Sequence, residues 1–383
     1  MLLERDFPPD LRVEKEMQSL IEAGHQITLA CFTFRKKKEI EKNAALTIIR
    51  FPISKLIYKS SVAALKFPFY FDFWRRNLNR LLRQKSFDVV HVHDLPLAKI
   101  GSEIQKNFNI PFVLDLHENW PALLKISQHT NTLLGKLLSS QEQWEEFEKD
   151  SINQADRVIV VVQEMKARLI KKGFSEDKIA VISNTPAKID LPDLPPENRF
   201  TLIYAGGIDE QRGLQIALQA VKSVITIIPD LKFLIIGEGR YRRVLKQKTT
   251  EYNLTNNVVF TGWLGFDEMV GYLAGSHLAL IPHLRNDHTD TTIPHKLFQY
   301  FAAGKPVIAS DCTPLKRIIL ETNTGLIYRD NDPEQLADAI LNLAEDHQLY
   351  SEIRENQKKA LETYNWSEDA VRLCHVYRDL NNA

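Results

Sequence analysis

Short apolar runs alternate with amphipathic stretches along the whole chain. The runs at 112–116 and 232–236 have the length and content of buried strands, whereas apolar residues around Leu336 and Ile340 recur at helical spacing. This alternation predicts an α/β protein with parallel sheets. The predicted strands are 26–31, 46–51, 89–93, 112–116, 157–162 and 179–182 in the first half, and 201–205, 232–236, 258–261, 278–281, 307–309 and 325–327 in the second.

These two sets of six strands predict two Rossmann-like, doubly wound domains. A chain of 383 residues is also too long for one ordinary core. Ligands of such folds bind at the carboxyl ends of the strands, so we expect the site in a cleft between the domains. The expected parts are an N-terminal domain at 1–190, a proline-rich linker at 191–198, a C-terminal domain at 199–365, and a tail at 366–383 with an amphipathic helix from Trp366 to Leu380.

The bulk composition is that of a water-soluble globular protein, with 44% hydrophobic residues, 26% charged residues and a net charge of zero. Cys31, Cys312 and Cys374 are odd in number and show no paired spacing, which favours reduced thiols in a cytoplasmic protein. No apolar run approaches the roughly 18–20 residues of a membrane span. The chain opens abruptly, and its first three residues are expected to be the end of a first strand.

The segment 291–311 carries the strongest chemical signal. Pro294 suits a first helical turn, Gly304 a left-handed helix end, and Pro306 stops the helix before a short apolar strand. A helix start offers free N–H groups and a positive dipole end, and Lys296 adds a full positive charge in the first turn. A phosphate or diphosphate is therefore the expected ligand.

This segment resembles the donor-binding segment of family 4 of the retaining GT-B glycosyltransferases, which use nucleotide-diphosphate sugars. That family usually has two glutamates with seven residues between them, and the matching positions here are Thr291 and Gln299. The resemblance covers nearly the whole chain. It implies that Thr291, Thr292 and Ile293 contact the donor, that Gln299 bonds the ribose, and that the last helix crosses back onto the first domain.

Two further stretches match donor-site loops of the same family. Gly206 and Gly207 follow a predicted strand and precede Arg212, which can hold a diphosphate bidentately. Here the family usually offers two positive charges, of which only Arg212 is present. The alternative interpretation is a turn with a solvent-exposed arginine. The loops at 237–239 and 262–264, with donor candidates Gly237, Glu238, Trp263 and Leu264, also fit ordinary strand-to-helix turns.

In the first domain, His117 ends a predicted strand and matches the histidine that contacts the donor sugar in the family. A histidine there can bond sugar hydroxyls or exchange a proton near neutral pH, although a structural role is the alternative. Glu118 and Asn119 follow it as acceptor-side candidates. His91 and His93 favour structural roles, with His93 and Asp94 as candidates for the cleft.

The loop after the first strand supplies the remaining acceptor-side candidates. Phe7 and Pro8 belong to a stiff Phe-Pro-Pro-Asp sequence, and Arg12 is placed to meet a phosphate or carboxylate of an acceptor. The simpler interpretation is a helix N-terminus capped by Asp10. The two interpretations are compatible, because Asp10 can cap the helix while Arg12 binds an acceptor.

Residues 50–85 are strongly basic, with nine Lys or Arg against a single acid, Asp72. Phe67, Phe71, Trp74, Leu78 and Leu81 fall on one helical face. A basic helix with an aromatic stripe can lie on an anionic membrane, whereas packing of the stripe against the sheet is the alternative. No nucleic-acid-binding pattern is evident.

No metal or other cofactor is expected. Asp330 and Asp332 have the Asp-x-Asp spacing of a metal-binding motif, but Asp332 precedes Pro333 and fits a helix N-cap. His283 and His288, with nearby aspartates, match no zinc spacing.

The predicted function is transfer of a sugar from a nucleotide-diphosphate sugar to a saccharide or lipid-linked acceptor in bacterial surface-polysaccharide or glycolipid assembly. The resemblance implies retention of anomeric configuration, with Arg212 and Lys296 neutralising the leaving diphosphate and His117 holding the sugar. The protein is expected in the cytoplasm, either free or as a peripheral protein on the inner face of the membrane. Two alternatives are a nucleotide-sugar epimerase and a non-catalytic subunit that binds a sugar nucleotide, the latter motivated by the missing glutamates.

Overall fold

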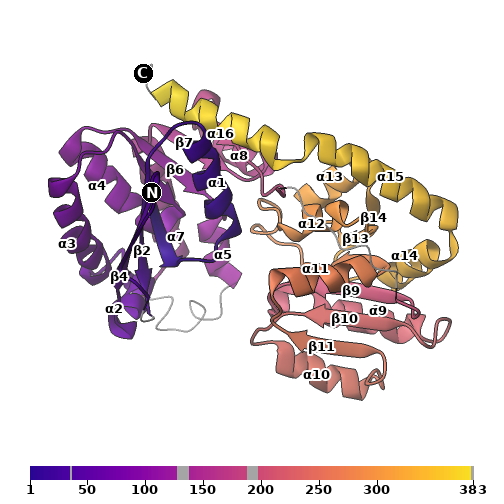
Figure 1. Cartoon of the computed structure of the whole chain (residues 1–383). Coiled ribbons are helices and arrows are strands. Elements are labelled where there is room, and N and C mark those ends of the chain that lie inside the picture. Colours follow the sequence, from indigo (N-terminus) through magenta and orange to yellow (C-terminus); the bar gives the residue numbers. More distant parts are fainter. Residues whose placement is uncertain (35–36, 127–137, 188–196, 381–383) are drawn as a thin grey trace. The chain divides into compact units, whose positions relative to one another are not determined.

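The structure is a computed structural model that describes residues 1–34, 37–126, 138–187 and 197–380 (Figure 1). Contacts divide the chain into two compact units, Met1–Ser183 with Asp369–Ala383, and Asn184–Glu368. The chain therefore leaves the first unit a few residues before the predicted boundary and returns to it near the C-terminus. Most of the predicted linker 191–198 lies outside the described residues.

The first unit is built on an eight-stranded sheet of order β3-β4-β2-β1-β5-β6-β7-β8. All paired strands are parallel except β3 and β4, which are antiparallel. Every residue of β2 is buried, as expected for a strand covered on both faces. The strands are β1 (Leu2–Asp6), β2 (Ile27–Thr33), β3 (Ile40–Lys42), β4 (Leu46–Pro52), β5 (Val90–His93), β6 (Phe112–Leu116), β7 (Arg157–Val160) and β8 (Ile179–Val181).

Local sequence signals explain where helices of this unit begin and end. Asp10 caps α1, because its side chain accepts hydrogen bonds from the backbone N–H groups of Arg12 and Val13. Asn109 ends α4 in the left-handed conformation. The helices are α1 (Leu11–Glu22), α2 (Lys55–Lys59), η1 (Ser60–Ala63), α3 (Phe69–Gln84), η2 (Leu95–Leu97), α4 (Ala98–Phe108), α5 (Trp120–Ile126), α7 (Gln141–Gln154), α8 (Gln163–Lys171), η3 (Glu176–Lys178) and most of α16 (Trp366–Leu380).

The second unit has a six-stranded parallel sheet of order β11-β10-β9-β12-β13-β14. The order runs outward in both directions from β9 and β12, which is a doubly wound arrangement with a switch point between these two strands. The strands are β9 (Thr201–Ala205), β10 (Lys232–Ile236), β11 (Val258–Gly262), β12 (Leu278–Ile281), β13 (Val307–Ser310) and β14 (Gly325–Tyr328).

Helices of the second unit cover its sheet and complete an apolar core that includes Leu202, Phe233, Leu280 and Leu336 (Figure 1). Asp332 caps α14, and Pro333 is its first residue, as predicted. The helices are η4 (Glu210–Arg212), α9 (Leu214–Val224), α10 (Arg242–Glu251), α11 (Phe266–Gly275), α12 (Lys296–Ala302), α13 (Thr313–Thr322), α14 (Pro333–Glu345) and α15 (His347–Thr363).

The aromatic stripe of the basic segment packs inward. Phe71, Trp74 and Leu78 on α3 are buried, which confirms sheet packing for these residues. Phe67 remains exposed, and Arg50 is buried, with its guanidinium bonded to the carbonyls of Phe7 and Lys38. Among the described helices, none is long and apolar enough to cross a bilayer.

Candidate functional site

A glycine turn at the carboxyl end of β9 is the centre of the site in the second unit. Gly206 has a φ of +144°, and a Cβ built on it would lie 2.7 Å from Lys296 Nζ. Gly237, after β10, would place a Cβ 1.9 Å from the carbonyl oxygen of Gly206. Gly239 would likewise clash with the carbonyl of Ile208. Only residues without a side chain allow the two loops to interlock this closely.

Lys296 reaches this turn from the first turn of α12. Its Nζ lies 3.6 Å from the centroid of the Tyr204 ring, a cation–π contact. One turn further along α12, Tyr300 Oη accepts a hydrogen bond from the backbone N–H of Ala205. Burial of Lys296, with a further contribution from Arg212, holds its pKa well below the usual lysine value. Burial therefore opposes the full charge that the sequence predicts at this position.

Arg212 is the second cation of this site. It ends η4, and Gly213 follows in the left-handed conformation. A Cβ at Gly213 would also collide with the carbonyl of Pro282, so only glycine fits there. The Arg212 side chain is partly buried, and within the described part of the chain it has no hydrogen-bond or ion-pair partner. Its charge contributes to the lowered pKa of Lys296. An unpaired, half-buried guanidinium is available to a dianionic ligand.

His283 was missed as a donor-site residue. It lies just after β12 and is buried, and its Nε2 has no hydrogen-bond partner among the described residues. Burial, followed by the charges of Arg212 and Lys296, holds the pKa of His283 well below its usual range. The sequence signal for this role is its position just after a strand at the switch point, whereas its spacing from His288 matches no metal motif.

The two neighbouring loops contribute unequally. The Glu238 carboxylate already forms an ion pair within the chain, because its Oε1 lies 2.6 Å from Arg242 Nη1. A Cβ on Gly262 would lie 3.1 Å from the same carboxylate oxygen. Trp263 is 65% exposed and Leu264 is partly buried. Trp263 is thus an open aromatic surface on which a ligand can stack.

The segment 291–311 differs in detail from the sequence prediction. Helix α12 begins at Lys296, two residues later than Pro294, and has only seven residues. Thr291 donates from Oγ1 to the carbonyl of Asp287, and Ile293 is buried with its carbonyl bonded to Asn184. The segment therefore supports the site through Lys296 rather than through a long helix dipole. Gly304 ends the helix in the left-handed conformation, as predicted.

Residues Thr292 and Gln299 remain donor-site predictions. Both are partly buried. Gln299 lies three residues after Lys296, so the two side chains share a face of α12. Gln299 replaces a carboxylate of the family pattern, and its neutral amide can both donate and accept.

The first unit gathers its candidates around Asp115 on β6. Arg12 forms ion pairs of 2.9 Å with both Glu16 and Asp115, and all three side chains are buried. Arg12 also donates to the carbonyl of Ile182. The expectation that Arg12 is open to an acceptor anion is thus corrected, because the chain's own carboxylates occupy its guanidinium.

His117 follows β6 and lies between two carboxylates. Its Nε2 is 2.8 Å from Asp115 Oδ2, and its Nδ1 is 3.6 Å from Asp94 Oδ2. Burial alone lowers the pKa of His117, but Asp115 and Asp94 outweigh burial and raise it to about 9. His117 is therefore cationic at neutral pH, a hydrogen-bond donor rather than the proton-exchanging group considered from the sequence. Its Nδ1 is the nitrogen available to a ligand.

The remaining acceptor-side candidates are mainly structural in their visible contacts. Phe7 is buried, and its carbonyl accepts from Arg50 at 2.7 Å. Asn119 is buried and accepts through Oδ1 from the N–H of Ala122, at the start of α5. Pro8 is exposed and Glu118 is partly buried. His93 is fully buried, so it is not a surface residue of a cleft.

Two family models match consecutive parts of the sequence. Residues 13–185 match Glycosyltransferase Family 4, and residues 188–360 match Glycosyl transferases group 1. The chain belongs to the family 4 (group 1) glycosyltransferases. The resemblance inferred from 291–311 is confirmed, and this glycosyltransferase is of the retaining, nucleotide-sugar-dependent class.

Curated relatives are distant but extend over most of the glycosyltransferase. An uncharacterized glycosyltransferase of Methanocaldococcus jannaschii is 23% identical, over 79% of this chain and 78% of that protein. Phosphatidyl-myo-inositol mannosyltransferase of Mycolicibacterium smegmatis is 21% identical, over 85% and 79%. The lipopolysaccharide core biosynthesis glycosyltransferase LpsD of Rhizobium meliloti is 24% identical, over 80% and 78%.

Solved structures confirm the predicted GT-B fold of the glycosyltransferase. Sucrose-phosphate synthase from Thermosynechococcus elongatus matches with a TM-score of 0.79 and 18% identity, covering 97% of this chain and 93% of that one. Anabaena HepE in complex with UDP-glucose matches with a TM-score of 0.69 and 15% identity, covering 99% and 98%.

Proposed function

We propose that this glycosyltransferase moves a sugar from a nucleotide-diphosphate sugar, with a uridine nucleotide as the first candidate, to a saccharide or lipid-linked acceptor. The observation that carries the donor assignment is the pair of cations at the glycine turn. Arg212 lacks a partner within the described chain, and Lys296 lies against Gly206. UDP-glucose bound to the HepE structure supports the choice of nucleotide.

The cations have a defined role in this reaction. Negative charge grows on the diphosphate as the bond to the sugar breaks, and fixed positive groups stabilise that charge. Burial and the charge of Arg212 lower the pKa of Lys296. A bound diphosphate favours the charged lysine, so the donor itself completes the cationic site. The departing diphosphate is then placed to accept the proton of the attacking hydroxyl.

We assign His117 the role of hydrogen-bond donor to the transferred sugar. Its raised pKa keeps both ring nitrogens protonated at neutral pH. Nε2 is held by Asp115, which leaves Nδ1 to donate. Gln299 is assigned to the ribose of the nucleotide.

A membrane-bound acceptor is supported by exposed apolar and basic side chains of α2 and the start of α3, which we call the basic apolar patch. Leu56 is 82% exposed and Phe69 63% exposed, and Lys55 and Lys59 lie beside Leu56 on exposed positions of α2. Apolar side chains flanked by lysines are suited to an anionic lipid surface. We therefore propose a peripheral protein at the cytoplasmic face, acting in bacterial surface-polysaccharide or glycolipid assembly.

The test of the donor assignment begins with thermal shifts. UDP- and GDP-sugars are added to the whole protein, because a ligand that binds the folded state raises Tm by mass action. The selected donor is then incubated with and without lipid-linked saccharides. Transfer with retention supports the proposal. Release of an epimerised donor without any acceptor would favour an epimerase, and binding without hydrolysis or transfer would favour a non-catalytic subunit.

Variants separate catalysis from folding in this assay. Arg212→Ala should lower turnover strongly while leaving Tm nearly unchanged. Arg243→Ala, on an exposed position of α10, is the matched control and should change neither quantity. Equal damage by both variants would refute the role of Arg212.

A further inference from the structure

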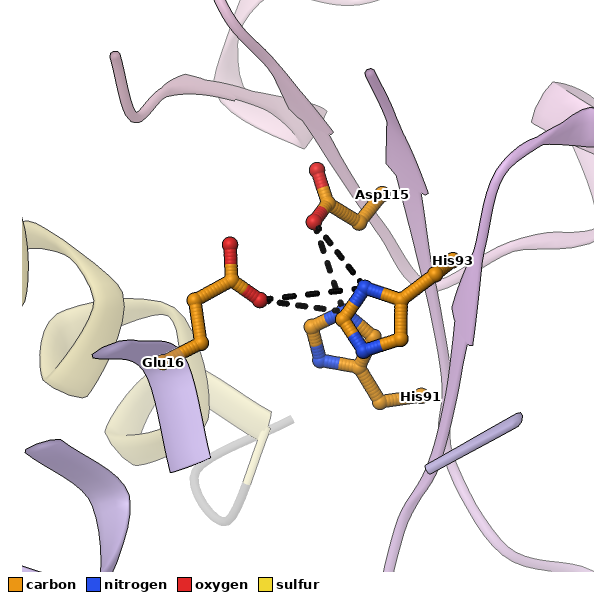
Figure 2. Close-up of side chains that lie close together, drawn as sticks. All are labelled: Glu16, His91, His93 and Asp115. Carbon is orange, nitrogen blue, oxygen red and sulfur yellow. Dashed lines mark ion pairs between the residues drawn. The ribbon is translucent and has the colours of Figure 1, made fainter. Parts of the chain in front are cut away.

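Four buried side chains from three elements converge inside the first unit (Figure 2). Glu16 lies on α1, His91 and His93 on β5, and Asp115 on β6. One carboxylate oxygen of each acid and one ring nitrogen of each histidine are turned toward one another, and these four atoms lie within 4.8 Å of each other.

The spacing of these atoms is too wide for hydrogen bonds. Glu16 Oε2 lies 3.9 Å from His91 Nε2 and 3.8 Å from His93 Nδ1. Asp115 Oδ2 lies 3.7 Å and 3.4 Å from the same two nitrogens. N–H···O bonds in proteins measure about 2.7–3.2 Å. Four groups able to bond therefore face one another across a gap.

Two of the four atoms lack any hydrogen-bond partner among the described residues. These are Glu16 Oε2 and His91 Nε2, both on fully buried side chains. An unsatisfied buried polar group costs about 1–3 kcal/mol. A ligand in the gap would remove this cost.

We propose that Glu16, His91, His93 and Asp115 bind one Zn²⁺ ion. Zinc bonds of about 2.0–2.2 Å in a tetrahedron separate neighbouring ligand atoms by about 3.3–3.6 Å. The four acid–histidine distances of 3.4–3.9 Å are slightly wider, so the ligands would draw together around the ion. Two imidazoles favour zinc over Mg²⁺ or Ca²⁺, which prefer all-oxygen sites. The chain supplies all four ligands, so the ion is structural: it ties α1 to β5 and β6.

Groups around the cluster orient its ligands. Tyr377 Oη lies 2.6 Å from His91 Nδ1, a contact that leaves Nε2 to face the ion. Arg12 forms ion pairs with the outer oxygens, with Nη2 2.9 Å from Asp115 Oδ1 and Nε 2.9 Å from Glu16 Oε1. Its Nε also lies 3.3 Å from Asp115 Oδ2. This pattern of outer-sphere donors is common around metal-binding carboxylates and histidines.

Arg12 and His117 are also the cations that compete with a metal. His117 Nε2 is 2.8 Å from Asp115 Oδ2 and 3.3 Å from His93 Nδ1. Either the ion and these cations share the carboxylates, or the cations alone balance them. The experiment decides between these two states.

The test uses the full chain produced in medium supplemented with zinc sulfate. After exhaustive buffer exchange, elemental analysis should find about one zinc per chain. Crystals of the same protein should give an anomalous peak at the zinc absorption edge, about 2.0–2.2 Å from the four ligand atoms. Protein that retains no zinc, or a peak elsewhere, overturns the proposal.

Single variants locate the ion. Glu16→Gln and His91→Gln should each lower the retained zinc at least tenfold. His375→Gln, at an exposed position of α16, is the matched control and should retain it. Unchanged zinc in a folded Glu16→Gln protein also overturns the proposal. If a cluster variant fails to fold, the anomalous map of the wild-type protein gives the answer alone.

Discussion

Replacement of Gly206 by alanine directly perturbs the donor site. The added Cβ would lie 2.7 Å from Lys296 Nζ and 3.5 Å from Tyr204 Oη, and the backbone at φ +144° disfavours any side chain. The lysine ammonium must leave its position over the Tyr204 ring, or the turn must move. Both responses displace the cation that we assign to the diphosphate.

The size of the effect follows from two contributions. A non-glycine residue held in such a conformation costs about 1–3 kcal/mol of folding free energy. A lost hydrogen bond to a charged group costs about 1.5–3 kcal/mol, which corresponds to a roughly 10- to 100-fold weaker Kd for a nucleoside diphosphate. We expect Gly206→Ala to show both effects.

Gly207→Ala is the matched control, because the adjacent residue has ordinary φ and its Cβ would meet only Asp209 Oδ2, at 3.7 Å. Calorimetric titration with UDP and urea unfolding are measured for both variants. Gly207→Ala should stay within about twofold of wild type in Kd. A Gly206→Ala protein with wild-type UDP affinity would refute the position of the diphosphate beside Lys296.

Three further outcomes are expected. UDP binding should be coupled to proton uptake, because the diphosphate raises the lowered pKa of Lys296. The affinity for UDP should therefore fall as pH rises. Calorimetric titrations in two buffers of different ionisation enthalpy measure the uptake, and Lys296→Met should abolish it. Arg12→Met should lower the free energy of unfolding by about 3–5 kcal/mol, because it leaves buried carboxylates without their cation. Lys358→Met, which removes an exposed ion pair, should lower it by less than about 1 kcal/mol in the same urea experiments. Anionic vesicles should retain the protein at low salt and release it at high salt, and Phe69→Ser should weaken retention in a flotation assay; equal retention of the variant would contradict a role for the basic apolar patch.

Much of the fold follows from local pattern. Strands β9, β10 and β12 have the bounds predicted for them, because buried parallel strands are short apolar runs with clear turns on either side. Helix α16 likewise spans the residues predicted for it. Strand β3 was missed because all three of its residues are exposed, so no apolar signal marks it.

The site was less accessible from sequence because its chemistry depends on distant partners. Arg12 meets Asp115 across 103 positions, so a residue that looks free in a loop is buried in an ion pair. Lys296 carries an ordinary charge in a helical pattern, and only its burial in the fold and the nearby charge of Arg212 lower its pKa. Glu16 gave no signal at all, since one acid on an amphipathic helix is usually exposed.

The return of Asp369–Ala383 to the first unit has a consequence for biosynthesis. The first unit is assembled from two stretches of chain, so a ribosome must translate all of Asn184–Glu368 before the earlier half can be completed. Until then, His91 lacks its hydrogen bond to Tyr377. The second unit, by contrast, is continuous in sequence and is free to mature first, even though it is made later.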